Sequence, residues 1–198
     1  MRPIIISVIS LLSLIIINIT PADAILMGLK DHEIQQAVSY GNFNAKTDDY
    51  EFLSEWIVNK GDYKGSAMLI TEFLRIAYSA RDAAIRAKEF TQHDINDAVA
   101  ESRGRLVFSV SLYGSLPNFS KNLMAELRTP EKTIEVSFWT NSPAEPFGDG
   151  MDAPGYVADC EYWFSNKEID PDSTVTLVVI NPASGKQWEF PIDLSKMR

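Results

Sequence analysis

Apolar residues in the first half of the chain recur at intervals of three or four, and this spacing predicts helices. Residues 66–89 are the clearest case, because neither proline nor glycine interrupts the segment. Its apolar stripe is formed by Leu69, Phe73, Ile76, Ala77, Ala80, Ala84 and Ala87. The first half of the stripe is bulky, and we expect it to fill a core. The second half is almost all alanine, and we expect it to let the backbone of another element come close. The pattern predicts one long central helix over residues 66–89.

Three shorter helices are predicted around this segment. The first begins at the Asp31 cap and ends at Gly41, a typical left-handed stop. The second runs from residue 48 or 49 to the Asn59-Lys60-Gly61 stop. The third begins at the capping box of Thr91-Gln92-His93-Asp94, with aspartate in place of the usual glutamate, and ends at Gly104.

After Gly104 the apolar period changes from three or four residues to two, which predicts strands. One short helix interrupts them at residues 118–127, where Phe119, Leu123 and Leu127 lie four apart. The last two strands, joined by the tight connection 181–185, are predicted to form a β-hairpin. The predicted strands cover residues 105–113, 133–140, 156–164, 174–180 and 187–192.

Helices followed by strands predict an α+β fold. We expect an N-terminal helical bundle-like half, residues 25–104, packed on a C-terminal antiparallel β-sandwich-like half, residues 105–198. The strand spacing suits an immunoglobulin-like sandwich, although the pair of cysteines that flanks a tryptophan in immunoglobulin domains is absent from the sequence. Each half is close to the lower size limit for independent stability, so we expect one composite domain.

Residues 1–24 have the features of a signal peptide. Arg2 precedes the apolar run 4–19, and Ala22-Asp23-Ala24 has the small-x-small form read by signal peptidase. The run spans roughly 24 Å as a helix, against about 30 Å for a hydrocarbon core, which argues against a retained membrane anchor. We therefore expect cleavage after Ala24 and a periplasmic or secreted mature protein.

Charge and cysteine content exclude several classes of protein. The chain carries a net charge of -9 and has no local cluster of lysine or arginine, which argues against nucleic acid and anionic membrane surfaces as partners. Its single cysteine, Cys160, cannot form an internal disulfide. We expect Cys160 to be buried and inert, because it lies on the apolar face of a strand between Asp159 and Glu161.

Catalytic and cofactor motifs are not recognisable in the sequence. His32 and His93 lie in or beside helix caps, and neither has a second histidine or a cysteine at the spacing of a zinc site. The Gly-x-Ser-x-Gly motif and the glycine-rich nucleotide motifs do not occur. We therefore expect no cofactor.

Residues 141–155 form a long acidic segment rich in proline and glycine, in which we expect Phe147 and Met151 to be exposed. Its acidic residues Glu145, Asp149 and Asp152 are weak candidates for binding a hard cation such as calcium, although their spacing does not match an EF-hand. A solvated connection between strands is the simpler interpretation. The same segment is the first place to look for a site that binds a protein partner.

These observations favour an exported, non-catalytic protein with a role in binding or in the structure of the cell envelope. One alternative is a secreted hydrolase with loop residues forming a site between the helical half and the sheet, which predicts a deep pocket with carboxyls of perturbed pKa. The other alternative is a calcium-dependent binding module centred on Asp149 and Asp152.

Overall fold

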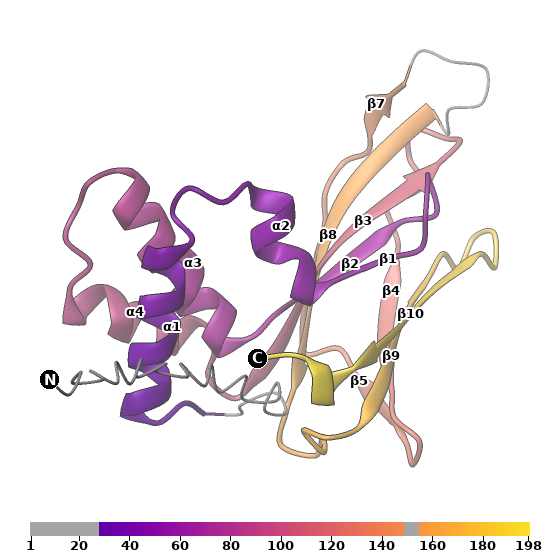
Figure 1. Ribbon diagram of the computed structural model, residues 1–198. Helices are drawn as coiled ribbons and strands as arrows, with labels where there is room; N and C mark the ends of the chain where they lie inside the picture. The colour runs from indigo at the N-terminus through magenta and orange to yellow at the C-terminus, as the bar shows by residue number, and fades with distance from the viewer. Residues whose placement is uncertain (1–27, 149–154) are drawn as a thin grey trace, which may run out of the picture.

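The computed structural model describes residues 28–148 and 155–198, so the predicted signal peptide lies outside the described residues. The α+β prediction is confirmed: four helices lie in the N-terminal part, and two antiparallel sheets pack as a sandwich beside them (Figure 1). Within the described part, no helix has both the length and the apolar character needed to cross a membrane.

Three of the four helices, α1, α2 and α4, begin close to their predicted residues, whereas α3 begins six residues later than predicted. α1 spans Asp31–Phe43, α2 spans Asp49–Leu53, α3 spans Glu72–Ile85 and α4 spans Gln92–Ser102. The predicted capping box of α4 is present, because the Thr91 hydroxyl accepts from the Asp94 N–H and the Asp94 carboxylate accepts from the Thr91 N–H. The side chain of Thr71 caps α3 in the same way, by accepting from the N–H of Leu74.

The Thr91 cap gives a test of this local structure. Replacing Thr91 with alanine should cost about 1 kcal/mol of stability, because the N–H of Asp94 loses its acceptor. The hydrogen bonds from Thr91 also hold the pKa of the Asp94 carboxyl below its usual value. The ionised Asp94 carboxylate therefore stabilises the folded state at neutral pH, and this stabilisation is lost as the pH falls through the folded-state pKa of Asp94. Thermal unfolding of Thr91→Ala and wild type, at neutral and acid pH, measures both effects; an unchanged melting temperature at neutral pH would contradict the cap.

The prediction of a single helix over residues 66–89 is wrong. Residues Ser66–Ile70 form the strand β2, and the helix begins only after Thr71. β2 pairs on one side with β1, Ile57–Asn59, and on the other with β3, Arg105–Gly114. Ala67 and Leu69 point into the core, as a strand with a two-residue period requires. The N-terminal region is therefore not purely helical, because it contributes two strands to the larger sheet.

The alanine-rich half of the stripe does admit a second backbone. α1 crosses α3 there, and Gly41 lies directly against the α3 backbone: a Cβ atom on Gly41 would be 2.1 Å from the carbonyl oxygen of Ala77. The prediction that Gly41 ends α1 is wrong, since the helix continues to Phe43. Glycine is needed at this position because the two helices approach closely.

Two sheets make up the rest of the fold. The six-stranded sheet has the order β1-β2-β3-β8-β6, with β7 also paired to β8, and the four-stranded sheet has the order β10-β9-β4-β5. The predicted hairpin is confirmed, with Trp188 of β10 opposite Val179 of β9. The remaining strands are β4 Met124–Arg128, β5 Thr133–Glu135, β6 Phe138–Asn141, β7 Glu145–Phe147, β8 Gly155–Ser165, β9 Thr174–Ile180 and β10 Gln187–Asp193.

Two further predictions in the C-terminal half are wrong. Residues 118–127 do not form a helix; residues 118–123 are a loop that leads into β4, where Ala125 and Leu127 face the core. Residues 133–140 do not form one strand, because the chain leaves the four-stranded sheet after β5 and joins the six-stranded sheet as β6. Both differences arise from pairing with strands distant in sequence.

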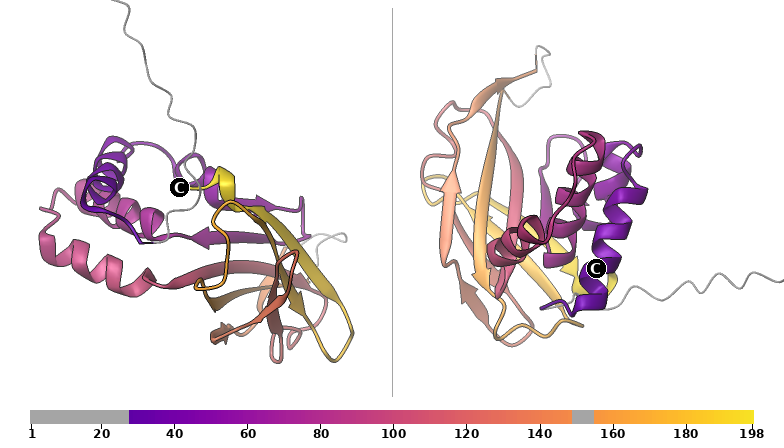
Figure 2. Two further views of the ribbon diagram at one scale, coloured as in Figure 1. Left: turned by 90° about the horizontal axis from the view of Figure 1, so that it is seen from below. Right: turned by 90° about the vertical axis from the view of Figure 1, so that its left-hand side faces the viewer.

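One connected set of buried side chains runs from the helices into the space between the sheets. Trp56 and Phe73 belong to its helical end, and Phe108, Tyr162 and Phe190 belong to its sheet end. After β10, the short 3-10 helix Leu194–Lys196 leads the end of the chain back toward the helices, as both views in Figure 2 show.

Candidate functional site

Several turns meet at the end of the sheets that lies farthest from the helices (Figure 1). They are the β1–β2 turn, the end of β3 with the loop after it, the strand β7, and the β9–β10 turn. We call this region the distal end. It contains two cavities and a group of aromatic side chains.

The aromatic cluster of the distal end consists of Tyr63, Tyr113 and Phe147. The ring centroids are 5.8 Å apart for Tyr63–Tyr113, 5.8 Å for Tyr63–Phe147 and 5.1 Å for Tyr113–Phe147, and all three pairs meet edge to face. Tyr63 has a φ of 57°, which is unfavourable for an aromatic residue, and its side chain is 49% exposed. The β1–β2 turn therefore holds an exposed aromatic ring in a strained conformation, as often occurs at binding sites.

The first cavity lies beside this cluster and has a volume of about 440 Å³. It is formed by the β1–β2 turn and the first residues of β10. Its lining residues are Lys60, Tyr63, Lys64, Lys186, Gln187, Trp188 and Glu189.

The second cavity lies between the loop after β3 and the β9–β10 turn, and has a volume of about 450 Å³. Phe119 forms part of its floor, and it can do so because Gly114 has no side chain: a Cβ atom there would be 2.3 Å from the Phe119 ring. The other lining residues are Ser115, Leu116, Asn118, Lys121, Asn122, Asn181, Ala183, Ser184, Lys186 and Trp188.

Lys186 and Trp188 line both cavities and so form a wall between them. The Lys186 ammonium nitrogen lies 4.3 Å from the Trp188 ring centroid and donates a hydrogen bond of 3.3 Å to the carbonyl oxygen of Tyr113. Partial burial lowers the pKa of Lys186 from its ordinary value. This wall is held in place by one cation–π contact and one hydrogen bond.

The linings of the two cavities carry a net positive charge, opposite in sign to that of the whole chain. The two cavities are lined by four lysines, Lys60, Lys64, Lys121 and Lys186, and by one acidic residue, Glu189. The net charge of the chain is -9. Because these lysines come from three separate segments, the sequence shows no basic cluster, and the positive surface exists only in the folded protein.

The structure brings only part of the predicted 141–155 site to the distal end. Phe147 joins the aromatic cluster, and Glu145 is exposed on β7 opposite Val157 of β8. Asp149 and Asp152 lie outside the described residues, and the described ones contain no group of three or more side chains able to hold a metal ion. The calcium hypothesis for these residues stays a prediction.

The other candidate residues lie elsewhere. His32 and His93 are exposed in the first turns of α1 and α4. Cys160 is buried on β8, and this burial raises the pKa of its thiol. A buried thiol with a raised pKa has little of the thiolate form that acts as a nucleophile.

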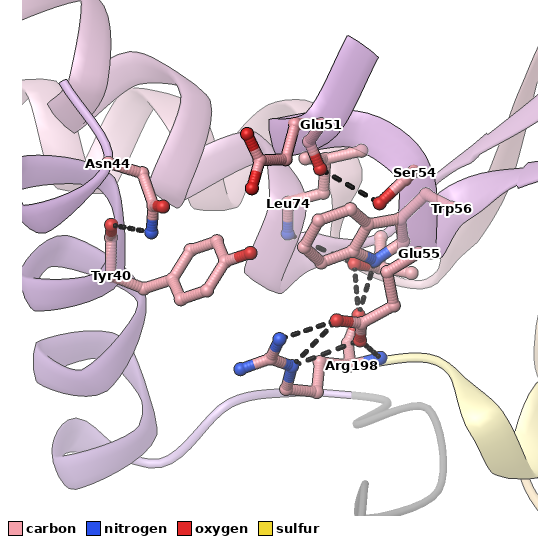
Figure 3. Close-up of polar contacts among 9 residues, drawn as sticks. Tyr40, Asn44, Glu51, Ser54, Glu55, Trp56, Leu74 and Arg198 are labelled. Atoms are coloured by element: carbon pink, nitrogen blue, oxygen red, sulfur yellow. Dashed lines mark hydrogen bonds and ion pairs between the residues drawn. The ribbon is translucent and has the colours of Figure 1, made fainter. Parts of the chain in front are cut away.

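A polar cluster joins the end of the chain to the helical part (Figure 3). The main-chain oxygen of Arg198 accepts hydrogen bonds from Trp56 Nε1 at 2.9 Å and from Thr71 Oγ1 at 2.6 Å. The Arg198 guanidinium forms an ion pair with the Glu55 carboxylate, and this carboxylate also accepts a hydrogen bond of 3.0 Å from the Arg198 N–H. The same guanidinium lies over the Tyr40 ring, 4.6 Å from the ring centroid. We call this cluster the C-terminal clasp. Since both oxygens of Glu55 bind Arg198, the carboxylate acts as an anchor.

The hydrolase alternative predicts a deep pocket between the helices and the sheets. A third cavity, of about 500 Å³, lies between α3 and α4, and the other two lie at the distal end, so none of these three is in that position. Glu72 is a buried carboxyl whose pKa is raised by burial, but it accepts a hydrogen bond from the N–H of Leu29 and lines none of the three cavities. The described geometry gives the hydrolase alternative no specific support.

Comparison with known proteins identifies no family for this chain. No protein-family model matches the sequence, and no curated protein matches it. Among solved structures, the chain has a distant similarity to the archaellum periplasmic stator protein FlaG from Sulfolobus acidocaldarius. The two share 13% sequence identity with a TM-score of 0.32, over 45% of this chain and 86% of that chain. This similarity assigns neither a family nor an activity.

Proposed function

We propose that this chain is an exported, non-catalytic binding protein that recognises a component of the cell envelope or its surroundings through the distal end. The observation that carries the proposal is the gathering of Lys60, Lys64, Lys121 and Lys186 around Trp188 on a chain with a net charge of -9. A local field of opposite sign attracts a partner of complementary charge and orients it.

The lining of the two cavities supports binding as their role. Their polar side chains are chiefly amides, hydroxyls and ammonium groups, among them Asn118, Asn122 and Ser184. Such groups hold a ligand by hydrogen bonds and charge. Their volumes of about 440 and 450 Å³ are within the range of small-molecule sites.

Apolar side chains support a recognition surface that extends from the cavities to β7. Tyr63 and Leu116 are 49% and 60% exposed, and both line a cavity. Phe147 ties the segment 141–155 to this surface, so the proposed partner contacts that segment as well. Export to the periplasm or the exterior, with removal of residues 1–24, is part of the proposal and rests on the signal-peptide pattern.

Photo-crosslinking from the distal end tests the proposal. Benzoylphenylalanine replaces Tyr63 in the full chain, which is then expressed in the organism that encodes it. The control is the same substitution at Tyr50, which is 71% exposed on α2 and lines neither cavity. We expect a light-dependent adduct from position 63 that excess unlabelled protein prevents, and none from position 50. Equal adducts from both positions, or none from position 63, would contradict a binding site at the distal end.

A further inference from the structure

We infer that the distal end binds an acidic oligosaccharide, with neighbouring sugar units in its two cavities. This inference rests on the proposed function and names the class of its ligand.

The arrangement of the cavities indicates a ligand with repeating units. Both cavities share the wall of Lys186 and Trp188, and their volumes are nearly equal, at about 450 and 440 Å³. Because the Lys186 amine is held against Trp188 and the Tyr113 carbonyl, the wall is in place before any ligand arrives. Two similar adjacent cavities with a preformed wall between them suit a chain of similar units.

The charges indicate that the units carry anionic groups. Lys60 and Lys64 lie in the first cavity, Lys121 lies in the second, and Lys186 lies between them. Lys60, Lys64 and Lys121 are exposed, so their ammonium groups are free to move toward a ligand. Glu189 is the only acidic residue of the two linings, and it lines the first cavity alone. Positive charge on both sides of the wall matches a ligand with an anionic group on successive units.

The neutral side chains indicate a ligand rich in hydroxyl groups. Ser115, Asn118, Asn122 and Ser184 line the second cavity, and each of these side chains can donate and accept hydrogen bonds, as a hydroxyl group does. The exposed side chain of Leu116 offers apolar surface to the C–H faces of a sugar ring. A site that combined charge with apolar surface alone would suit a lipid or an aromatic anion; the amides and hydroxyls favour a sugar.

Isothermal titration of the exported product of the full chain tests the inference, with three glycan probes. The probes are a galacturonate oligomer, which carries carboxylates, dextran sulfate, which carries sulfates, and neutral dextran. We expect saturable binding of at least one anionic glycan at 0.15 M salt, and at least tenfold weaker binding of dextran. A polyglutamate peptide of the same charge should also bind at least tenfold more weakly than that glycan.

Matched lysine variants show whether binding occurs at this site. Lys64→Gln and Lys121→Gln should each weaken glycan binding about fivefold or more, and Asn122→Ala should weaken it as well. Lys167→Gln makes the same change of charge at an exposed lysine outside both cavities and should change the affinity less than twofold. All of these side chains are exposed, so unchanged melting temperatures will show that the variants fold.

Every outcome bears on the inference. Failure of both anionic glycans to bind, equal binding of polyglutamate, or equal effects of Lys64→Gln and Lys167→Gln would each overturn it. If these occur while the adduct from position 63 forms, the ligand class is wrong and the binding function stands. If the adduct is also absent, the proposed function falls with it.

Discussion

Replacing Gly41 with alanine should lower the melting temperature by roughly 2–12 °C, because the added methyl group has no space between α1 and α3. The Cβ atom would be 2.1 Å from the Ala77 carbonyl oxygen and 3.0 Å from the Arg81 amide nitrogen. Both are backbone atoms of α3, so the clash is relieved only if the two helices separate. Overpacking of this kind costs about 1–3 kcal/mol, and sometimes more.

The sign of the change makes this experiment informative. At an unconstrained position inside a helix, alanine is more favourable than glycine by about 1 kcal/mol, so Gly41→Ala would then stabilise the protein. The control is Ser39→Ala, an exposed position two residues earlier in the same helix, where we expect little change. Thermal unfolding followed by circular dichroism measures both variants. A melting temperature that rises in Gly41→Ala would show that the helices do not approach closely at this position.

Gly41 also illustrates what the sequence can and cannot predict. The sequence predicted that Ala77 and Ala80 would admit a second backbone, and this is confirmed by the buried crossing of α1 on α3. It assigned Gly41 to a helix end, because a glycine at a stop and a glycine at a close crossing look alike in one sequence. Only the position of the neighbouring helix separates these two roles.

The wrong helix predictions have a common physical cause. In residues 66–70, Ala67 and Leu69 fit a two-residue period, while Leu69 and Phe73 fit a helical one, so local pattern alone does not decide. Pairing of β2 with both β1 and β3 decides it, and β3 is about 40 residues away. The same holds for Leu123 and Leu127. Their spacing of four residues predicted a helix, but residues 124–128 form the strand β4 because they pair with β9 and β5.

The β9–β10 hairpin was predictable because its two strands are adjacent in the chain and each has an unambiguous strand pattern. β9 spans the predicted residues Thr174–Ile180, and β10 extends the predicted strand by one residue to Asp193. Each has a strong local pattern, and the short 181–185 connection fixes their register. Predictions failed where the deciding contact was distant in sequence.

The candidate site was even less accessible to sequence analysis. Lys60 and Lys186 are separated by 126 positions and meet only because two hairpin turns lie at the same end of the fold. Phe147 was the exception, since its segment was predicted as a partner site from its length and composition. Lys60 lies in the predicted stop at residues 59–61 and Lys186 directly follows the predicted connection 181–185, but one sequence gives no reason to place these two segments together.

Replacing Arg198 with alanine should destabilise the protein by about 2 kcal/mol, because the clasp loses its ion pair and its cation–π contact together. The Glu55 side chain is only 22% exposed, so its carboxylate would be left partly buried without its partner. The matched control is Arg86→Ala, which removes the ion pair between Arg86 and Asp82. The side chains of Arg86 and Asp82 are 61% and 46% exposed. Exposed ion pairs within a helix contribute at most about 0.5 kcal/mol to stability, so we expect this variant to change the stability little. Chemical denaturation of both variants measures the difference.

A double-mutant cycle with Glu55→Ala isolates the contribution of the pair from other effects of each substitution. We expect a coupling of about 1 kcal/mol or more between Glu55 and Arg198, and a coupling near zero would contradict a stabilising clasp.

The same experiment tests the proposal of one composite domain, because Trp56 lies in the helical part and Trp188 lies in the sheets. If the halves unfold together, tryptophan fluorescence and far-ultraviolet circular dichroism will follow one transition, even in Arg198→Ala. Two separate transitions would show that the chain has two domains, which the clasp joins.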